Sequence, residues 1–127
     1  MSAMYEQDYI MRQIKECVAV AMKVFFDIET DPPASLIIQN HKKQVLADNL
    51  MDKIDSGKIE QAIFELKSET CNKYLDDLLL GYKFYSYLCQ KDDDFLEKYN
   101  INYYDIKNEM KNFFAGYISS DIINLLI

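Results

Sequence analysis

The scarcity of helix-breaking residues is the feature that most constrains how this chain can fold. Its 127 residues include 3 glycines and 2 prolines, and the prolines are adjacent, at Pro32 and Pro33. A proline pair cannot lie inside a helix, so one clear break separates an N-terminal segment from the rest. Elsewhere Lys, Glu, Leu and Ile favour helices, and no segment alternates polar and apolar residues as a half-buried strand does. The chain is therefore predicted to be all-α.

Apolar residues recur every three or four positions and predict five to seven helices. The first is expected over 6–26. The second is expected over 34–55, either continuous or interrupted near Asn40–Lys43. The others are expected from residue 58 onward and over 72–90, 92–99 and 102–117, with a last helical turn within 119–127. The length suits a single domain over 1–127, made of an N-terminal helix in 1–28 and a helical stack in 34–127.

The segment 46–67 predicts two antiparallel helices joined by a tight turn. Gly57 suits the left-handed position that ends a helix, and Ala62 is small enough to let two helices approach closely. This spacing resembles a tetratricopeptide-type hairpin, although any hairpin of two helices can share it. A shift by the 34-residue period of such repeats pairs Gly57 with Lys91 and Ala62 with Leu96, so a second copy lacks the diagnostic residues. A tetratricopeptide-like antiparallel stack is expected rather than a regular repeat array.

Charge and cysteine content exclude several classes of partner. The chain has 21 acidic and 14 basic residues and a net charge of −7, which repels nucleic acid and anionic lipid. Its three cysteines, Cys17, Cys71 and Cys89, form no Cys-x-x-Cys motif. They are interpreted as reduced thiols in a cytoplasmic protein. No apolar run approaches the roughly 20 residues that span a bilayer. We expect no nucleic-acid partner and no membrane span.

The residue patterns that carry common enzyme chemistry are missing from the sequence. Glycines at 57, 81 and 116 cannot form a phosphate-binding loop, and no Gly-x-Ser-x-Gly occurs. The single histidine, His41, cannot supply the paired Glu-x-x-His motifs of a di-iron bundle. The run Asp92, Asp93 and Asp94 lacks the spacing of a calcium loop and suits a helix N-terminus instead. We predict no catalytic, metal-binding or cofactor-binding residues, and a protein that is not an enzyme.

In three places the sequence has more apolar side chains than one buried helix face requires. These are the end of the first helix, the tail 122–127, and Leu80 with Tyr87, which fall within the polar stripe of the helix over 72–90. Such a surplus favours contact with a protein partner or with a second copy, as in a dimer. Burial beneath a neighbouring helix is the competing explanation for Leu80 and Tyr87. The leading hypothesis is a non-enzymatic interaction module or self-associating scaffold.

Two sets of residues are candidates for the interaction site. The first is expected to be exposed beside the hairpin and on the helix over 72–90. In the second, Asp8 and Arg12 are four positions apart, so their side chains can form an ion pair along the first helix. The alternative interpretation is an ordinary helix ion pair with no role in binding. The first set is Tyr74, Leu80, Lys83 and Tyr87, and the second is Tyr5, Asp8, Tyr9 and Arg12.

A different function class remains open because the chain holds 10 tyrosines and 7 phenylalanines. They cluster in the predicted helices over 72–90 and 102–117. An aromatic pocket between these helices would bind a small ligand, although aromatic residues more often fill a core. A third hypothesis, contact of the end of the first helix and the apolar tail with a membrane surface, is opposed by the negative net charge.

Three stretches resemble a family of short uncharacterised proteins from Gram-positive, clostridial-type bacteria. They are the opening over 5–16, which reads YEQDYIMRQIKE, the segment 54–59 followed by Ala62, and the segment 91–96, which reads KDDDFL. The resemblance implies an all-α cytoplasmic protein. It supplies no activity and therefore no catalytic residues.

Overall fold

Polar side chains at the helix starts set where several helices begin in the computed structural model. The structure describes residues 3–29 and 37–127, with side chains from residue 7 onward. In four helices the residue before the first turn accepts a hydrogen bond from the backbone N–H three positions later, which satisfies a group that the helix leaves unpaired. These capping residues are Asn40, Asp92, Asn102 and Ser119.

The part of the chain that the structure describes contains seven helices and no strand, which confirms the all-α prediction. Residues 37–40 are not helical and α2 begins at His41, within the segment where the sequence leaves an interruption open, so a continuous helix over 34–55 is wrong. The expected helical residues 34–36 lie outside the described residues. The helices are α1 (Ala3–Phe25), α2 (His41–Asp55), α3 (Ile59–Glu69), α4 (Leu75–Cys89), α5 (Asp93–Lys98), α6 (Tyr103–Phe114) and α7 (Ser120–Leu126).

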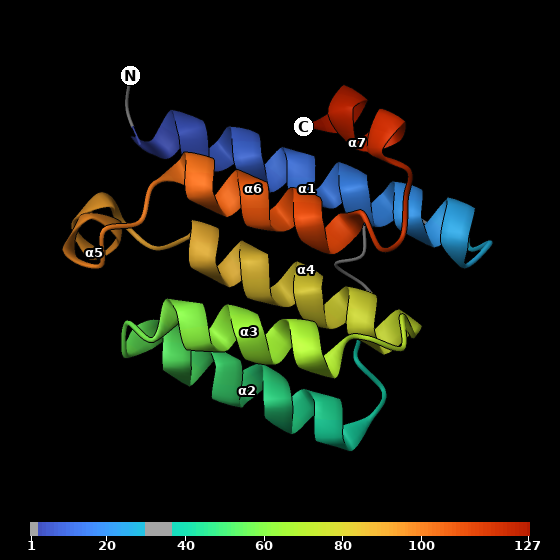
Figure 1. Ribbon diagram of the computed structural model, residues 1–127, viewed down its shortest axis with the longest axis horizontal. Helices are drawn as coiled ribbons and strands as arrows, with labels where there is room; N and C mark the ends of the chain where they lie inside the picture. The colour runs from blue at the N-terminus through green and yellow to red at the C-terminus, as the bar shows by residue number, and fades with distance from the viewer. Residues whose placement is uncertain (1–2, 30–36) are drawn as a thin grey trace.

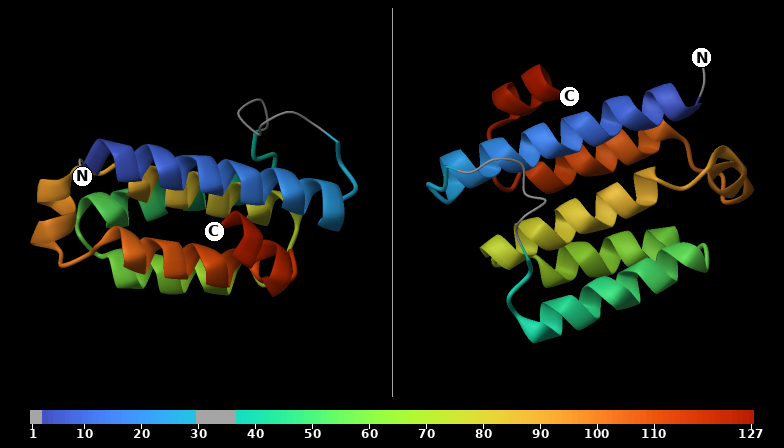
Figure 2. Two further views of the ribbon diagram at one scale, coloured as in Figure 1. Left: turned by 90° about the horizontal axis from the view of Figure 1, so that it is seen from above. Right: turned by 180° about the vertical axis from the view of Figure 1, so that it is seen from behind.

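The long helices form two layers. α1, α4 and α2 lie side by side in one layer, and α6 and α3 form the other (Figures 1 and 2). α4 is the central element, because it packs against α1, α2 and α6. The short α5 closes one end of the assembly, and α7 packs on α1. This arrangement leaves α3 and α6 on opposite sides of α4, on the same face of the molecule.

The hydrophobic core is centred on α4 and includes side chains from all seven helices. A close approach between α4 and α6 depends on Gly81, because a Cβ atom there would lie 2.0 Å from the ring of Phe113. The fully buried side chains of α4 include Leu78, Leu80, Phe84, Tyr85 and Leu88. The prediction that this helix supplies much of the core is confirmed.

The α2–α3 hairpin has the tight turn that the sequence predicts. Gly57 adopts a φ of +79°, which is the left-handed region, and Ala62 is fully buried. The ring of Tyr99 packs directly against the turn, since a Cβ at Gly57 would lie 2.0 Å from it. A glycine is needed here for both reasons. These features are shared by hairpins of many helical proteins, so the tetratricopeptide-like arrangement stays a prediction.

The surplus apolar residues are partly absorbed by the core. On α1, Met22 is fully buried, whereas Val24 and Phe25 are 61% and 46% exposed. In α7, Ile123 is buried and Leu125 is 86% exposed. None of the described helices is both long enough and apolar enough to cross a membrane.

Candidate functional site

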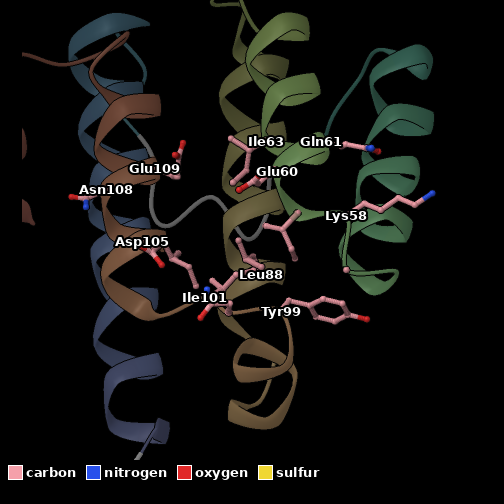
Figure 3. Close-up of a pocket in the computed structure, with 14 residues that line it drawn as sticks. Lys58, Glu60, Gln61, Ile63, Leu88, Tyr99, Ile101, Asp105, Asn108 and Glu109 are labelled. Carbon is pink, nitrogen blue, oxygen red and sulfur yellow. The ribbon is translucent and has the colours of Figure 1, made fainter.

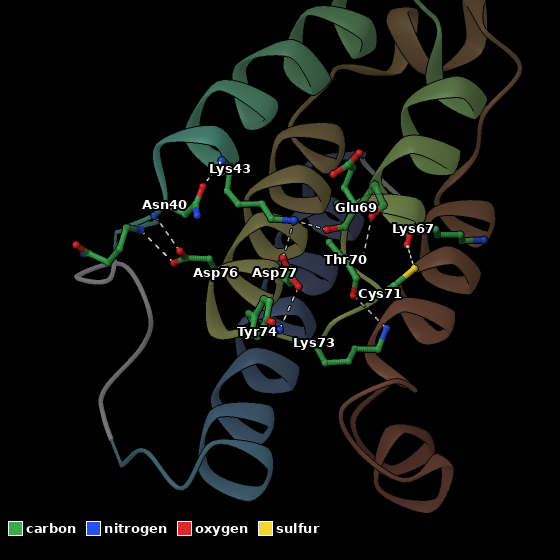
Figure 4. Close-up of polar contacts among 12 residues, drawn as sticks. Asn40, Lys43, Lys67, Glu69, Thr70, Cys71, Lys73, Tyr74, Asp76 and Asp77 are labelled. Carbon is green, nitrogen blue, oxygen red and sulfur yellow. Dashed lines mark hydrogen bonds and ion pairs between the residues drawn. The ribbon is translucent and has the colours of Figure 1, made fainter.

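The carboxylate of Asp76 joins the beginning of α4 to the beginning of α2 (Figure 4). Its two oxygens accept hydrogen bonds from the backbone N–H groups of Gln39 at 3.0 Å and Asn40 at 2.9 Å. This side chain therefore satisfies backbone groups just before α2, where residues 37–40 would otherwise leave them unpaired. Its role is structural.

Asp77 is fully buried and forms an ion pair with Lys43 of α2, with 2.9 Å between Oδ1 and Nζ. Its other oxygen, Oδ2, accepts the backbone N–H of Tyr74 at 3.1 Å. Lys43 also donates to the backbone carbonyl of Glu69 at the end of α3. Buried charges persist in proteins when they are paired in this way. One ion pair thus joins three helix ends (Figure 4).

Leu80, predicted to lie exposed at an interaction site, is fully buried, so that expectation is wrong. Its place in the hydrophobic core agrees with the competing explanation, burial among the packed helices. Tyr74 is 63% exposed and Lys83 is exposed. Tyr87 is half-buried, and its hydroxyl donates to Asp55 of α2 at 2.7 Å.

The second predicted set lies on α1 and does not form the expected pair. Asp8 and Arg12 are exposed, and the ion pairs of the described residues include none between them. Tyr9 is 50% exposed and faces Lys107 of α6, whose Nζ lies 5.9 Å from the ring centroid. The side chain of Tyr5 lies outside the described residues.

An open groove lies between α3 and α6, with α4 beneath it (Figure 3). Its volume is about 700 Å³. The turn at Gly57 and the ring of Tyr99 border one end. The apolar lining residues are Ile59, Ile63, Leu88, Ile101 and Ile106. None of these residues was singled out from the sequence as a site, because they come from four separate segments that only the folded chain brings together.

The charged residues of this groove are mostly acidic. Three carboxylates and one ammonium line it, and Glu109 is paired with Lys67 of α3 at 3.1 Å. Glu60 and Asp105 belong to no ion pair of the described residues, and Lys58 lies toward the Gly57 end. The groove therefore presents negative charge beside apolar surface.

The aromatic clusters of α4 and α6 are packed against each other. The rings of Tyr85 and Phe113 have centroids 5.9 Å apart, and both residues are buried. Burial, reinforced by the negative charge of Glu109, raises the pKa of the Tyr85 hydroxyl far above its ordinary value of 10.0, so this group stays protonated. The aromatic residue that lines the groove is Tyr99.

A second hollow, of about 520 Å³, lies over α4 between α1 and α2. Lys83 and Tyr87 line it together with Met11 and Lys15 of α1. The structure thus brings two of the predicted α4 residues into one hollow. It places Asp8, Tyr9 and Arg12 elsewhere on α1, outside its lining.

The described side chains offer little for thiol or metal chemistry. Burial raises the pKa of Cys17 and of Cys89 to about 12, with Glu16 adding to the shift at Cys17, so neither is a thiolate at neutral pH. Cys71 is exposed, and its thiol contacts the carbonyl of Lys67. No group of three or more His, Cys, Asp or Glu side chains among the described residues is arranged to hold a metal ion.

Comparison with known proteins identifies the family of the chain. No curated protein and no solved structure matches it. Residues 4–117 match the model of a family described as a family of unknown function, DUF6483. This match includes α1 to α6 and leaves α7 outside. It agrees with the sequence resemblance to an uncharacterised family and assigns no activity. Because the match covers most of the chain, the protein belongs to the DUF6483 family of unknown function.

Proposed function

We propose that the protein is a non-enzymatic interaction module whose groove between α3 and α6 binds a segment of a partner protein. The observation that carries this proposal is the open groove of about 700 Å³ with an apolar floor and a polar rim. Grooves of this kind bind peptides by burying apolar side chains, while polar groups at the edge fix orientation. Leu88 and Ile63 supply apolar surface at the base and on one wall.

The charge of the rim indicates which segment would fit. Glu60 is exposed and Asp105 is partly used by the backbone N–H of Asn102, at 3.3 Å. A partner segment with apolar residues and at least one Lys or Arg would pair with these carboxylates while its apolar side chains cover the floor. Charge complementarity of this kind sets orientation and association rate more than it sets affinity.

Site-specific photocrosslinking in the native host tests the proposal. A benzophenone amino acid would replace Gln61 or Asn108, which line the groove, or Asn124 of α7 as a control. We expect a discrete crosslinked product from both groove positions that is missing from the control, with mass spectrometry identifying the attached peptide. Identical products from all three positions, or none from the groove, would contradict the proposal.

A charge-matched pair of variants separates groove binding from general attraction to an acidic protein. Glu60→Lys changes the rim, and Glu97→Lys makes the same charge change on α5, outside the groove lining. Crosslinking from Gln61 should fall in the first variant and persist in the second. If the attached peptide derives from the chain itself, the groove serves self-association, which sedimentation velocity would show as a concentration-dependent dimer.

A further inference from the structure

The hollow on the face opposite the groove has a different chemical character. It lies over α4 and is bordered by α1, by Met51 of α2, and by Ile37 and Ile38 just before α2. The right panel of Figure 2 looks onto this side of α4, away from α3 and α6. It shares no lining residue with the groove between α3 and α6. Binding at one site therefore does not require the other.

Positive charge is concentrated in this hollow although the chain as a whole carries a net charge of −7. Among the residues that the structure describes, its lining includes Lys15 of α1 and Lys83 of α4 and no aspartate or glutamate. Both lysines are exposed, and neither takes part in an ion pair of the described residues. Two unpaired ammonium groups beside a low-dielectric wall attract an anion.

The remaining surface of the hollow is largely apolar and adaptable. Met11, Met51 and Leu79 contribute to its lining. Methionine side chains are flexible and polarisable, so they accommodate hydrocarbon of varied shape. The hydroxyl oxygen of Ser86, also in the lining, is buried without a hydrogen-bond partner.

We propose that this hollow binds a small anionic amphiphile, a carboxylate with a linear hydrocarbon tail. The carboxylate pairs with the ammonium groups of Lys15 and Lys83, and the tail lies against Met11, Met51 and Leu79. A volume of about 520 Å³ falls within the range of pockets that hold single small molecules. The positive lining selects against cationic amphiphiles, and the apolar walls select against small hydrophilic anions.

Titration of the full chain with dodecanoate, below its micelle concentration, tests this assignment. Binding would be followed by calorimetry and by amide chemical shifts. We expect saturable binding, with the largest shifts at Met51, Leu79 and Ser86. The uncharged analogue dodecanol should bind more weakly, because it has the same tail and lacks the carboxylate.

A pair of charge-matched double variants provides the control. Lys15→Gln/Lys83→Gln should weaken dodecanoate binding by about tenfold, since both ion pairs with the carboxylate are removed. Lys42→Gln/Lys111→Gln removes the same charge outside the hollow and should leave the affinity within about twofold. The proposal is overturned if binding does not saturate, if the shifts lie in the α3–α6 groove, or if dodecanol binds as tightly as dodecanoate. Equal losses in the two double variants would also overturn it.

Discussion

The carboxylate of Asp77 lies 2.9 Å from the ammonium group of Lys43, and the Asp77 side chain is fully buried while that of Lys43 is 19% exposed. Since Lys43 also donates to the carbonyl of Glu69, this pair connects the beginnings of α2 and α4 with the end of α3. Two charges in such a site have lost much of their hydration. Removing one partner therefore destabilises the protein strongly, because the other charge is left without its counterion.

Replacing Asp77 should strongly destabilise the protein. Asp77→Ala leaves the Lys43 ammonium partly buried without its counterion, and we expect the free energy of unfolding to fall by about 3–5 kcal/mol. Urea unfolding followed by circular dichroism measures this loss. Asp48→Ala, an exposed change on α2, is the control and should cost less than about 0.5 kcal/mol. Equal effects of the two substitutions would mean that the ion pair has no special importance.

Gly81→Ala should destabilise the protein although alanine is the better helix former. Helix propensity alone predicts a gain of about 1 kcal/mol. The added Cβ would lie 2.0 Å from the ring of Phe113, however, and overpacking of a core costs about 1–3 kcal/mol. A net loss of stability is therefore expected in thermal or urea unfolding.

The same substitution in a Phe113→Leu background tests this cause. With the ring removed, Gly81→Ala should become neutral or stabilising, and a double-mutant cycle gives the coupling between the two sites. A stabilising effect in the wild-type background would show that α4 and α6 do not approach as closely as the structure indicates.

The contribution of Asp55 to stability should depend on pH. Hydrogen bonds from Lys91 and then from Tyr87 hold the pKa of the Asp55 carboxyl below its ordinary value of 3.8. A carboxyl group with a lowered pKa in the folded chain stabilises that state above 3.8, and the effect is lost as the pH falls through the folded-state value. The stability difference between the wild type and Asp55→Asn should therefore be full at neutral pH and shrink below 3.8.

The stabilisation from the ion pair between Asp55 and Lys91 is also lost at alkaline pH, in this case when Lys91 loses its proton. The hydrogen bond with Asp55 raises the pKa of Lys91 above its ordinary 10.5, so its contribution is complete below that value and is lost as the pH rises through the folded-state pKa. Unfolding curves across the pH range measure both the loss of stability at acid pH and the loss at alkaline pH. Asp48→Asn is the control, and a matching pH profile for it would refute the assignment to Asp55.

The three cysteines should differ sharply in reactivity. Cys71 is exposed, whereas Cys17 and Cys89 are buried with pKa values raised to about 12. Because the thiolate is the reactive form, Ellman's reagent should modify one thiol rapidly in the folded protein and the other two after denaturation. Cys71→Ser should abolish the rapid phase. Rapid reaction of all three thiols would mean that α1 and α4 separate readily.

Local features of the sequence were sufficient to predict the helices and many of their ends. Asn102 with Asp105 and Ser119 mark helix starts, and Gly57 marks a turn, because capping and positive φ depend on residues close in the chain. The sequence left open whether the second helix is interrupted near Asn40–Lys43. It could not decide this, because the periodic apolar residues give no signal that Asp76 on another helix binds the backbone of residues 39–40 in a non-helical conformation.

The candidate sites could be predicted only in part. Lys83 and Tyr87 were identified on the polar stripe of α4, and both line the hollow between α1 and α2. Leu80 lies on the same helix and is buried, because α4 is packed by α1, α2 and α6 and the helical wheel of α4 alone could not show which of its sides they cover. The pairing of Asp8 with Arg12 failed because spacing permits such a contact without requiring it.

The sequence by itself determined that this chain is helical, where its helices turn and which helix forms the centre of the core. These properties follow from breakers, caps and apolar period, all of which act over a few residues. Only the tertiary structure decided which surfaces remain open. The groove between α3 and α6 and the hollow between α1 and α2 are formed by residues far apart in the chain, whose proximity depends on how the helices pack.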